Sequence, residues 1–355
     1  MYALIMAGGS GTRLWPQSRQ NQPKQLLKFI KNQTLLQTTY TRLRKAFSDS
    51  EIFVATINSY KGNIKKQVPQ IPLANYSLET ATKDRGPAIG LAALIMWKRD
   101  PESFFITAWS DHYIKNETAY FQALKSAEAF LKKQPGYFLT IGVRPSSAHT
   151  GFGYIELGKK LSGQVFGAKS FKEKPDAKTA KKFLQNKNYL WNTGYFVCKC
   201  ETLLQLYKKH LPEVYKILMK IQPFIGTKRQ QLAINKFYPQ MPEVDIEKGL
   251  IEKLNKVAVV PGSFDWADVG SWQVIKDILS PDDKNLIQGE VLAQNSRGNL
   301  IYNFEKNKLV AGVGLENLLI VNTKDALLVV PKNRSEEVKQ LVKNLKKGKK
   351  FKKYL

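Results

Sequence analysis

The N-terminal 25 residues constrain the fold of this chain more than any other segment. An apolar run over residues 4–7 is typical of a buried first strand, and a glycine-rich turn follows it. Three glycines within four positions let the backbone turn sharply and present its N–H groups to a ligand. Two cations, Arg13 and Lys24, follow the turn. Backbone amides together with an arginine and a lysine provide the many donors that a polyphosphate requires. The predicted nucleotide-binding residues of this loop are Gly8, Gly9, Ser10, Gly11, Thr12, Arg13 and Lys24.

This loop differs from the two commonest nucleotide-binding loops. Thr12 and Arg13 do not supply the Gly-Lys-Ser/Thr end of a Walker loop. Leu14 stands where a dinucleotide-binding loop requires its third glycine. The alternative is a plain glycine-rich turn with an incidental arginine, but Arg13 and Lys24 together favour a phosphate ligand.

The 355 residues leave room for a large core and two domains, and the hydrophobic content of 43% is that of a globular protein. Apolar β-rich runs alternate with stretches of helical periodicity, which predicts an α/β fold with a doubly wound, mostly parallel sheet. The expected strands cover 2–7, 51–56, 104–109, 137–143 and 193–199, the expected helices cover 34–47, 86–98, 117–133 and 176–186, and 201–252 is expected to be mostly helical.

The pattern changes near residues 280–283, Ser-Pro-Asp-Asp. Short β-type pieces punctuated by turn residues follow, and a last helix is expected over 334–347. We predict a first domain over 1–280 and a small C-terminal β domain, ending in a basic helix, over 281–355. The expected β pieces cover 299–304, 308–313, 318–322 and 326–330.

The net charge of +27 raises nucleic-acid binding as a function. Lysines occur along the whole chain, however, and only residues 343–355 form a basic block, with seven lysines and no acid. A general lysine preference of the host explains a bias of this kind, and we expect no specific nucleic-acid partner. The positive field still attracts phosphorylated substrates.

Two further features bear on the compartment. No apolar run approaches the roughly 20 residues that span a membrane, and no basic region of a signal peptide precedes the first strand. We therefore expect a cytoplasmic protein without a membrane span. Cys198 and Cys200 lie one residue apart, which disfavours a disulfide, and two sulfurs alone make no zinc site, so both are interpreted as buried apolar residues.

Several motifs in one order along the chain resemble the sugar-nucleotide pyrophosphorylases. The segment GGSGTRLWPQSR, followed by PKQ at 23–25, is similar to their mannose-1-phosphate guanylyltransferase branch, to which Trp15, Ser18 and Arg19 point. The resemblance covers about residues 1–275 and implies a Rossmann-like, doubly wound mixed sheet in a nucleotidyltransferase domain. It implies a short left-handed β-helix for the C-terminal β domain, without the isomerase domain of longer relatives.

Two carboxylates are predicted to hold Mg²⁺. Asp111 follows the apolar run 104–109, and an Asp at a strand end beside a phosphate loop suits an ion that prefers carboxylate, phosphate and water oxygens. The alternative is a turn-capping Asp, and His112 is expected to be structural or to orient Asp111. Asp268, in DVGSW at 268–272, completes the metal site by resemblance, with Asp265 as its local rival.

Three further motifs resemble the family's sugar-phosphate site. In FKEKP, the resemblance implies that Glu173 binds sugar hydroxyls and that Lys174 binds the sugar phosphate. The alternative is a charged surface segment, because such tripeptides are common. Asn192, in WNTGYF, can donate to and accept from a sugar hydroxyl. Gly153, in GFGYI, would bring backbone against the sugar.

The segment expected to contact the nucleobase departs most from the family pattern. Glu79, Gly86 and Pro87 are predicted to bind the nucleotide, but Lys83 replaces Arg, and Asp-Arg-Gly at 84–86 replaces Asn-Thr-Ala. Guanine offers N–H donors, so its site must provide acceptors, and carboxylates and backbone carbonyls at this segment can do so. The departure bears on the guanine preference rather than on the reaction type.

The resemblance implies transfer of GMP from GTP to mannose 1-phosphate, which gives GDP-mannose and pyrophosphate. The expected catalytic residues position the phosphates and neutralise charge, and they are Arg13, Lys24, Asp111 and Asp268. One alternative is the same chemistry on heptose or glucose 1-phosphate or with another nucleotide. The remote alternative is a basic nucleic-acid-binding protein. A homodimer is compatible with the sequence, which leaves the oligomeric state open.

Overall fold

The computed structural model describes residues 1–9, 11–29 and 32–355, so Ser10 of the predicted phosphate loop lies outside the described residues. The chain divides into two compact units and passes repeatedly from one to the other. Unit 1 comprises Met1–Gly8, Thr39–Ser110 and Ile114–Trp266, and unit 2 comprises Gly9–Thr38, Asp111–Tyr113 and Ala267–Leu355.

Unit 1 is built on a nine-stranded sheet with the order β3-β2-β1-β4-β9-β6-β10-β8-β7. The pairs among β3, β2, β1 and β4 are parallel, as is the β6–β10 pair. The strands are β1 (Tyr2–Met6), β2 (Ile52–Ile57), β3 (Tyr76–Glu79), β4 (Phe104–Trp109), β6 (Phe138–Val143), β7 (Tyr154–Ser162), β8 (Val165–Lys172), β9 (Tyr189–Lys199) and β10 (Val257–Gly262).

The predicted mixed α/β fold is confirmed, but the expectation of a mostly parallel sheet is wrong. Strand β9 runs antiparallel to β4 and to β6, between which it lies. Strands β7 and β8 form a hairpin around Gly163, whose φ of 50° suits a tight turn. A two-residue connection can join only antiparallel neighbours, so this turn fixes the direction of β8.

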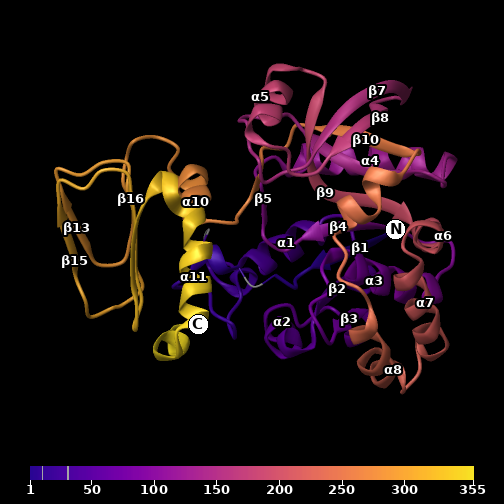
Figure 1. Cartoon of the computed structure of the whole chain (residues 1–355), viewed down its shortest axis with the longest axis horizontal. Coiled ribbons are helices and arrows are strands. Elements are labelled where there is room, and N and C mark those ends of the chain that lie inside the picture. The colour runs from indigo at the N-terminus through magenta and orange to yellow at the C-terminus, as the bar shows by residue number, and fades with distance from the viewer. Residues whose placement is uncertain (10, 30–31) are drawn as a thin grey trace. The chain divides into compact units, whose positions relative to one another are not determined.

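Helices of unit 1 cover both faces of its sheet (Figure 1). Successive residues of a strand point to opposite faces. Tyr195 contacts the ring of Tyr120 in α4, whereas Phe196 belongs to the core cluster formed with α3 and α6. The helices are α2 (Lys61–Gln67), α3 (Arg85–Arg99), α4 (Glu117–Lys133), α5 (Ala177–Gln185), α6 (Cys200–His210), α7 (Pro212–Ile221), α8 (Gln230–Phe237) and α9 (Ile246–Gly249).

The helices at 86–98, 117–133 and 176–186 and the helical segment 201–252 form as predicted. Helix α1 (Leu35–Leu43) ends four residues before the expected 47 and carries the chain from unit 2 into unit 1. Cys198 and Cys200 are buried and free, as interpreted from the sequence. Among the described residues, no helix combines the length and apolar character that crossing a membrane requires.

The C-terminal part of unit 2 stacks short parallel strands. β12, β14 and β16 pair in parallel, β17 closes that sheet antiparallel, and β13 pairs in parallel with β15. This β-helix-like arrangement confirms the predicted small C-terminal β domain, and its handedness stays a prediction. The elements are β12 (Leu286–Gln288), β13 (Val291–Gln294), β14 (Leu300–Asn303), β15 (Val310–Val313), β16 (Leu318–Asn322), β17 (Leu327–Pro331), the 3₁₀ turn η9 (Lys332–Glu337), α11 (Val338–Lys347) and the 3₁₀ turn η10 (Lys349–Tyr354).

Buried asparagines join successive turns of this stack. The Nδ2 group of Asn322 donates to Oδ1 of Asn303 at 2.8 Å. Asn303 in turn donates to the backbone oxygens of Glu290 and Lys308. These hydrogen bonds satisfy polar groups that the stacked strands remove from water.

One core holds the two sequence ends of unit 2 together. Leu14 and Trp15, beside the glycine-rich loop, are buried with Val338 and Val342 of α11. Trp272, the first residue of α10 (Trp272–Leu279), donates its indole N–H to the Trp15 carbonyl at 3.0 Å. The conformation of the N-terminal loop therefore depends on residues near the C-terminus.

Candidate active site

Unit 2 contains a compact cluster of two carboxylates and one imidazole. The ligand atoms of Asp111, His112 and Asp268 all lie within 4.8 Å of one another. The short strands β5 (His112–Ile114) and β11 (Trp266–Asp268) pair at this point. The N–H of Val269 also donates to the Asp111 carbonyl at 3.0 Å, which holds the two segments in register. Asp265 is not a member of the cluster and occupies a turn with a φ of 49°.

Lys24 lies directly against these carboxylates. Its buried ammonium forms an ion pair with Asp111, lies 3.6 Å from Oδ1 of Asp268 and donates to the Val269 carbonyl at 3.3 Å. Gly11 makes this approach feasible, because its φ is 65° and an added Cβ would lie 2.5 Å from Cβ of Lys24. The glycine of the loop and the following lysine thus form one packed unit.

The electrostatics of the cluster favour the charged forms of Lys24 and Asp268. Burial alone would lower the pKa of Lys24, but the neighbouring Asp111 and Asp268 carboxylates outweigh it and raise that pKa. Burial would raise the pKa of Asp268, but the positive charge of Lys24 and the nearby His112 hold it below its usual range. Lys24 is therefore an ammonium group and Asp268 a carboxylate at neutral pH.

The donor set fits a divalent cation. Two carboxylates that converge on one point are the ligands that a hard ion such as Mg²⁺ prefers. Within the described residues, the buried Oδ1 atom of Asp268 accepts no hydrogen bond, so it is available to an ion. The cluster can thus bind a divalent metal, whose identity stays a prediction.

Arg13 borders the same cluster. Its Nη1 group donates to both carboxylate oxygens of Glu336, at 3.0 and 2.7 Å. A Cβ added to Gly270 would lie 2.7 Å from Nη2 of Arg13 and 3.5 Å from Oδ1 of Asp268. Gly270 therefore leaves room for the guanidinium beside the Asp268 carboxylate. Of the other loop residues, Gly9 is exposed and Thr12 begins the short 3₁₀ turn Thr12–Leu14.

Unit 1 brings together three of the four residues that the sequence assigns to the sugar. The Asn192 N–H donates to the Gly153 carbonyl at 2.8 Å. A Cβ on Gly153 would lie 2.5 Å from Oε2 of Glu173, so the glycine makes space for that carboxylate. Asn192 Oδ1 already accepts from the Thr140 hydroxyl and the Gly194 N–H, which leaves the side-chain NH₂ group for a ligand.

Lys174, the fourth residue, lies beside the same carboxylate. Its ammonium is 3.0 Å from Oε1 of Glu173, which is buried. The φ of Lys174 is 46°, an unusual value for a residue with a side chain. The N–H of Glu173 donates to the Glu252 carboxylate at 3.0 Å and helps to fix this strained turn.

Glu79 is buried near the start of the glycine-rich segment. Burial raises its pKa to about 7, although the Tyr238 hydroxyl, which donates to Oε2 at 2.6 Å, opposes the shift. A Cβ on Gly8 would lie 3.7 Å from Oε1 of Glu79. The predicted nucleotide residues Gly8 and Glu79 are therefore neighbours in unit 1.

Gly86 and Pro87 lie in the first turn of α3 and are buried by packing. The Gly86 N–H donates to the Val244 carbonyl at 2.9 Å, and a Cβ on Gly86 would lie 2.7 Å from that oxygen. The close packing of Val244 thus accounts for the glycine. Whether these two residues also contact a nucleotide stays a prediction.

The sequence reasoning missed two acidic partners of Arg85. This guanidinium pairs with Asp245 at 2.5 Å and with the buried Glu247 at 2.6 Å. The sequence did give one indication of this, because charged residues at 84 and 85 depart from the family pattern and Arg85 needs acidic partners. Glu336, the partner of Arg13, was also missed, and it has no local motif in the sequence.

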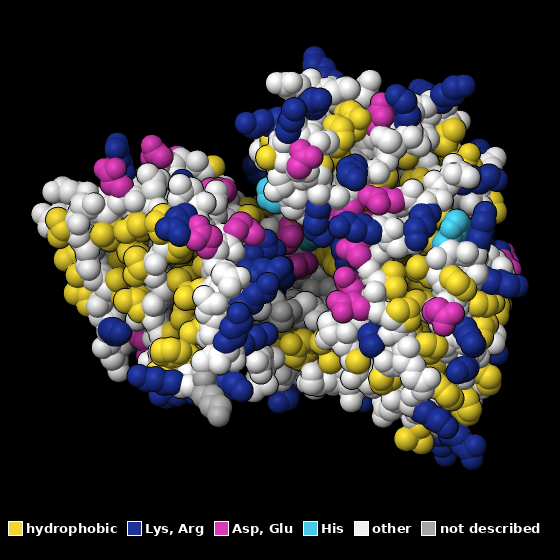
Figure 2. Space-filling view, in the orientation of Figure 1, with side chains coloured by type: hydrophobic (Ala, Val, Ile, Leu, Met, Phe, Trp, Pro, Cys, Tyr) yellow, Lys and Arg dark blue, Asp and Glu magenta, His cyan; other side chains and the backbone are white. Residues whose placement is uncertain are grey.

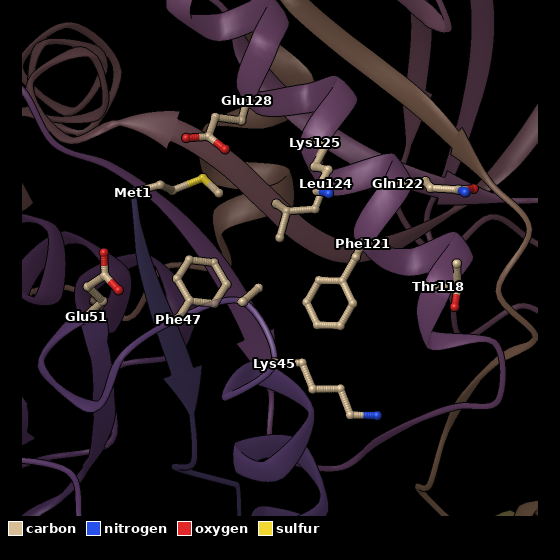
Figure 3. A pocket seen from close by; sticks show the side chains of 11 residues that line it. Met1, Lys45, Phe47, Glu51, Thr118, Phe121, Gln122, Leu124, Lys125 and Glu128 are labelled. Carbon is tan, nitrogen blue, oxygen red and sulfur yellow. The ribbon is translucent and has the colours of Figure 1, made fainter.

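A separate cavity of about 560 Å³ lies elsewhere in unit 1 (Figure 3). Phe47 and Phe121 flank it, with charged side chains such as Lys45 and Glu128 at its edge. None of the described residues predicted for phosphate, metal, sugar or base lines this cavity. It therefore contributes nothing to the site described above.

Two family models match consecutive parts of the chain. Residues 2–284 match the model described as nucleotidyl transferase, and residues 289–345 match the MannoseP isomerase/GMP-like beta-helix domain. A doubly wound sheet, a glycine-rich loop and paired carboxylates accord with the first of these descriptions. The chain is an enzyme of the nucleotidyltransferase class.

Individual relatives narrow the class further. The chain is 33% identical to the mannose-1-phosphate guanylyltransferase of Salmonella muenchen over 349 residues, which are 97% of this chain and 73% of that protein. It is 34% identical to mannose-1-phosphate guanylyltransferase 2 of Escherichia coli O157:H7, with the same coverage. A crystal structure from Thermus thermophilus, described as mannose-1-phosphate geranyltransferase, has a TM-score of 0.87 and 30% identity, and the match covers 97% of this chain and 99% of that one. The chain belongs to the mannose-1-phosphate guanylyltransferase family, which confirms the resemblance predicted from its motifs.

Proposed function

We propose that this chain transfers GMP from GTP to mannose 1-phosphate, with release of pyrophosphate, in a reaction that requires Mg²⁺. The observation that carries the proposal is the cluster of Lys24, Asp111 and Asp268 beside Arg13. Two carboxylates for a metal and two cations for phosphates are what in-line transfer at a phosphorus atom needs. Membership of the family supports GTP and mannose 1-phosphate as the substrates.

The proposed reaction needs no nucleophilic side chain. A phosphate oxygen of the sugar phosphate attacks the α-phosphorus of the nucleotide, and the bond to pyrophosphate breaks. Arg13 and Lys24 are proposed to stabilise the charge on the α-phosphate and on the departing pyrophosphate. Asp111 and Asp268 would hold Mg²⁺, which supplies charge neutralisation on the phosphates when it is bound.

Binding of metal and nucleotide is proposed to rearrange the ion pairs of Lys24. In the structure described here, its ammonium occupies the position between the carboxylates where a cation is expected. A divalent ion would replace this ammonium as the partner of Asp111 and Asp268. Lys24 would then be free to donate to a phosphate oxygen.

The residues near Gly153 are proposed to bind the sugar phosphate. Glu173 accepts hydrogen bonds from sugar hydroxyls, and the NH₂ group of Asn192 donates to another oxygen of the ring. Lys174 provides a cation for the phosphate. Burial of Glu173 and its ion pair with Lys174 support this arrangement, because both groups are held before a ligand arrives.

Glu79 is proposed to accept hydrogen bonds from guanine. Its burial and its contact with the Tyr238 hydroxyl give it a fixed orientation. Asp84 caps α3 through the Arg85 N–H at 2.7 Å, so its carboxylate is partly engaged already. We therefore assign the guanine preference to Glu79 and to backbone carbonyls rather than to Asp84.

The direct test is pyrophosphate release by the purified chain with Mg²⁺, crossing GTP, ATP, UTP and dTTP with mannose, glucose and heptose 1-phosphates. Release confined to GTP with mannose 1-phosphate is the expected result. Release with another pair would keep the chemistry and change the substrates. No release with any pair, together with salt-dependent DNA binding, would favour the nucleic-acid alternative.

We propose further that two copies of the chain associate through the β-helix-like stack. Figure 2 shows hydrophobic side chains gathered over this part of the chain, and Leu292 and Val313 are 61% and 69% exposed. Exposed apolar surface of this kind marks interfaces. Sedimentation of the Leu292→Lys/Val313→Lys variant should show a monomer where the unsubstituted chain is a dimer. A monomeric unsubstituted chain would contradict the proposal.

A further inference from the structure

The residue that contacts Arg13 from the C-terminal part of the chain is Glu336. Both carboxylate oxygens of Glu336 accept from the single Nη1 group of Arg13. The Nη2 group lies beside Gly270, where an added Cβ would be 2.7 Å from Nη2 and 3.5 Å from Oδ1 of Asp268. Glu336 therefore occupies one edge of the guanidinium and leaves its other edge toward the metal-binding carboxylate.

The backbone segments that carry Arg13 and Glu336 pack into one hydrophobic core. Glu336 lies in η9, where the neighbouring Ser335 is buried and its hydroxyl accepts the Gln273 N–H at 3.4 Å. Val338, two residues later, packs with Leu14, the residue after Arg13. The backbones that carry the carboxylate and the guanidinium thus share packing, and their separation is fixed.

We propose that Glu336 is a positioning residue for Arg13, an inference that rests on the proposed role of Arg13 in nucleotidyl transfer. A free arginine side chain has many rotamers, with about 2 kcal/mol of conformational entropy. Holding its Nη1 edge selects the rotamer in which the other donors face the carboxylate cluster. The phosphate then meets a guanidinium that is already oriented.

Because the Arg13–Glu336 pair is partly exposed, its contribution to positioning can be distinguished from a contribution to the stability of the fold. The side chains of Arg13 and Glu336 are 32% and 63% exposed, and exposed ion pairs contribute little to the free energy of unfolding. Removal of Glu336 should therefore change catalysis much more than stability. Misplacement of a catalytic group by about 1 Å can lower a rate by as much as 10²-fold.

The test compares Glu336→Ala with Glu337→Ala, which alters the adjacent residue of the same 3₁₀ turn. Glu337 pairs with Arg334 at the surface, at 2.6 Å. We expect Glu336→Ala to lower kcat about tenfold, with KM for the sugar phosphate unchanged, and Glu336→Gln to retain part of the activity because its amide oxygen still accepts. Glu337→Ala should match the unsubstituted chain, and both variants should keep its melting temperature.

A double-mutant cycle shows whether the effect passes through Arg13. In the Arg13→Ala background, the additional Glu336→Ala change should cause no further loss, because the residue it orients is absent. A further loss in that background, or a kcat within about twofold of the unsubstituted chain for Glu336→Ala alone, would overturn the inference.

A binding measurement separates this inference from the proposed function. If the unsubstituted chain releases pyrophosphate with no substrate pair, the proposed function fails, and titration with a fluorescent GTP analogue then tests Glu336 directly. Weaker binding to Glu336→Ala than to Glu337→Ala supports positioning. Equal or tighter binding to Glu336→Ala overturns it, and tighter binding would mean that the carboxylate competes with phosphate.

Discussion

Individual side chains of the proposed site carry charges that their neighbours maintain. Lys24 is buried, yet it keeps its proton because Asp111 and Asp268 lie beside it. Glu79 is also buried, but among the described residues it has no cationic partner of this kind, and burial raises its pKa to about 7. The two residues therefore respond differently to pH and to substitution.

Replacement of Lys24 should nearly abolish turnover. Lys24→Ala removes the cation proposed to stabilise the phosphates and leaves two partly buried carboxylates without this partner, so we expect a loss of roughly 10²-fold or more in kcat. Lys28→Ala, an exposed lysine of the same loop, serves as the control. Turnover of Lys24→Ala within about threefold of the unsubstituted chain would contradict the role assigned to this residue.

Glu79 should make stability depend on pH. Its pKa is about 7 in the folded chain and near the ordinary value of 4.5 in the unfolded chain, so between these pH values the folded chain binds more protons. Stability due to this group therefore falls as pH rises through that window. The Glu79→Gln variant keeps an acceptor for Tyr238 without a charge. It should match the unsubstituted chain near the lower limit and exceed it in free energy of unfolding above pH 7, by on the order of 3 kcal/mol.

Urea unfolding at the two ends of this window checks the prediction. Glu213→Gln, at an exposed position of α7, is the control and should show no pH-dependent difference. An equal effect of both substitutions at all pH values would show that Glu79 titrates normally.

At the scale of elements, the asparagines of the β-helix-like stack provide hydrogen bonds between strands that are too short to form many backbone hydrogen bonds with each other. Asn303 hydrogen-bonds to Asn322 and to the backbone oxygens of Glu290, which precedes it, and of Lys308, which follows it. Asn303→Ala leaves those buried groups unpaired, and we expect a loss of about 1–3 kcal/mol in free energy of unfolding. Asn307→Ala, at an exposed position, should cost much less in the same chemical denaturation experiment. Equal losses would mean that the buried hydrogen bonds add nothing.

The sequence predicted elements that have a strong local signal. The buried strand β1, the strand β4 and the helices α3 and α4 follow from apolar runs and helical periodicity. The β7–β8 hairpin was missed because it is largely exposed and rich in lysine, so no apolar run marks it. Strands β12 and β13, of three and four residues, are too short to show a period.

The candidate site shows the same limit. Motifs of adjacent residues indicated Lys24, Asp111 and Asp268, which the structure brings together. Arg13 was also indicated by its motif, but its partner Glu336 was not, because 323 positions separate the two residues and no local motif marks Glu336. Only the fold specifies which acidic residue meets which arginine.

At the scale of the whole molecule, the two compact units do not coincide with two continuous stretches of chain. Unit 2 includes residues from the N-terminal loop, from the middle and from the C-terminal third. The cluster of Lys24, Asp111 and Asp268 takes one member from each of these segments. Folding of this unit therefore requires all three.

Removal of the predicted C-terminal domain should abolish activity as well as the β-helix-like stack. A chain that ends at residue 280 lacks Val338 and Val342, which pack against Leu14 and Trp15. We expect no pyrophosphate release from this fragment and faster hydrogen exchange throughout residues 11–29. Full activity of the fragment would show that residues 1–280 form a self-sufficient catalytic domain.

The shared core of Leu14, Trp15, Val338 and Val342 also determines when unit 2 can finish folding during synthesis. The glycine-rich loop leaves the exit tunnel long before its packing partners in α11 are synthesised. At about 5–20 residues per second, the apolar side chains of the loop wait for roughly tens of seconds before these partners emerge. Unit 2 therefore cannot complete this core until α11 has emerged, and we expect nascent chains to expose Leu14 and Trp15 to chaperones until then.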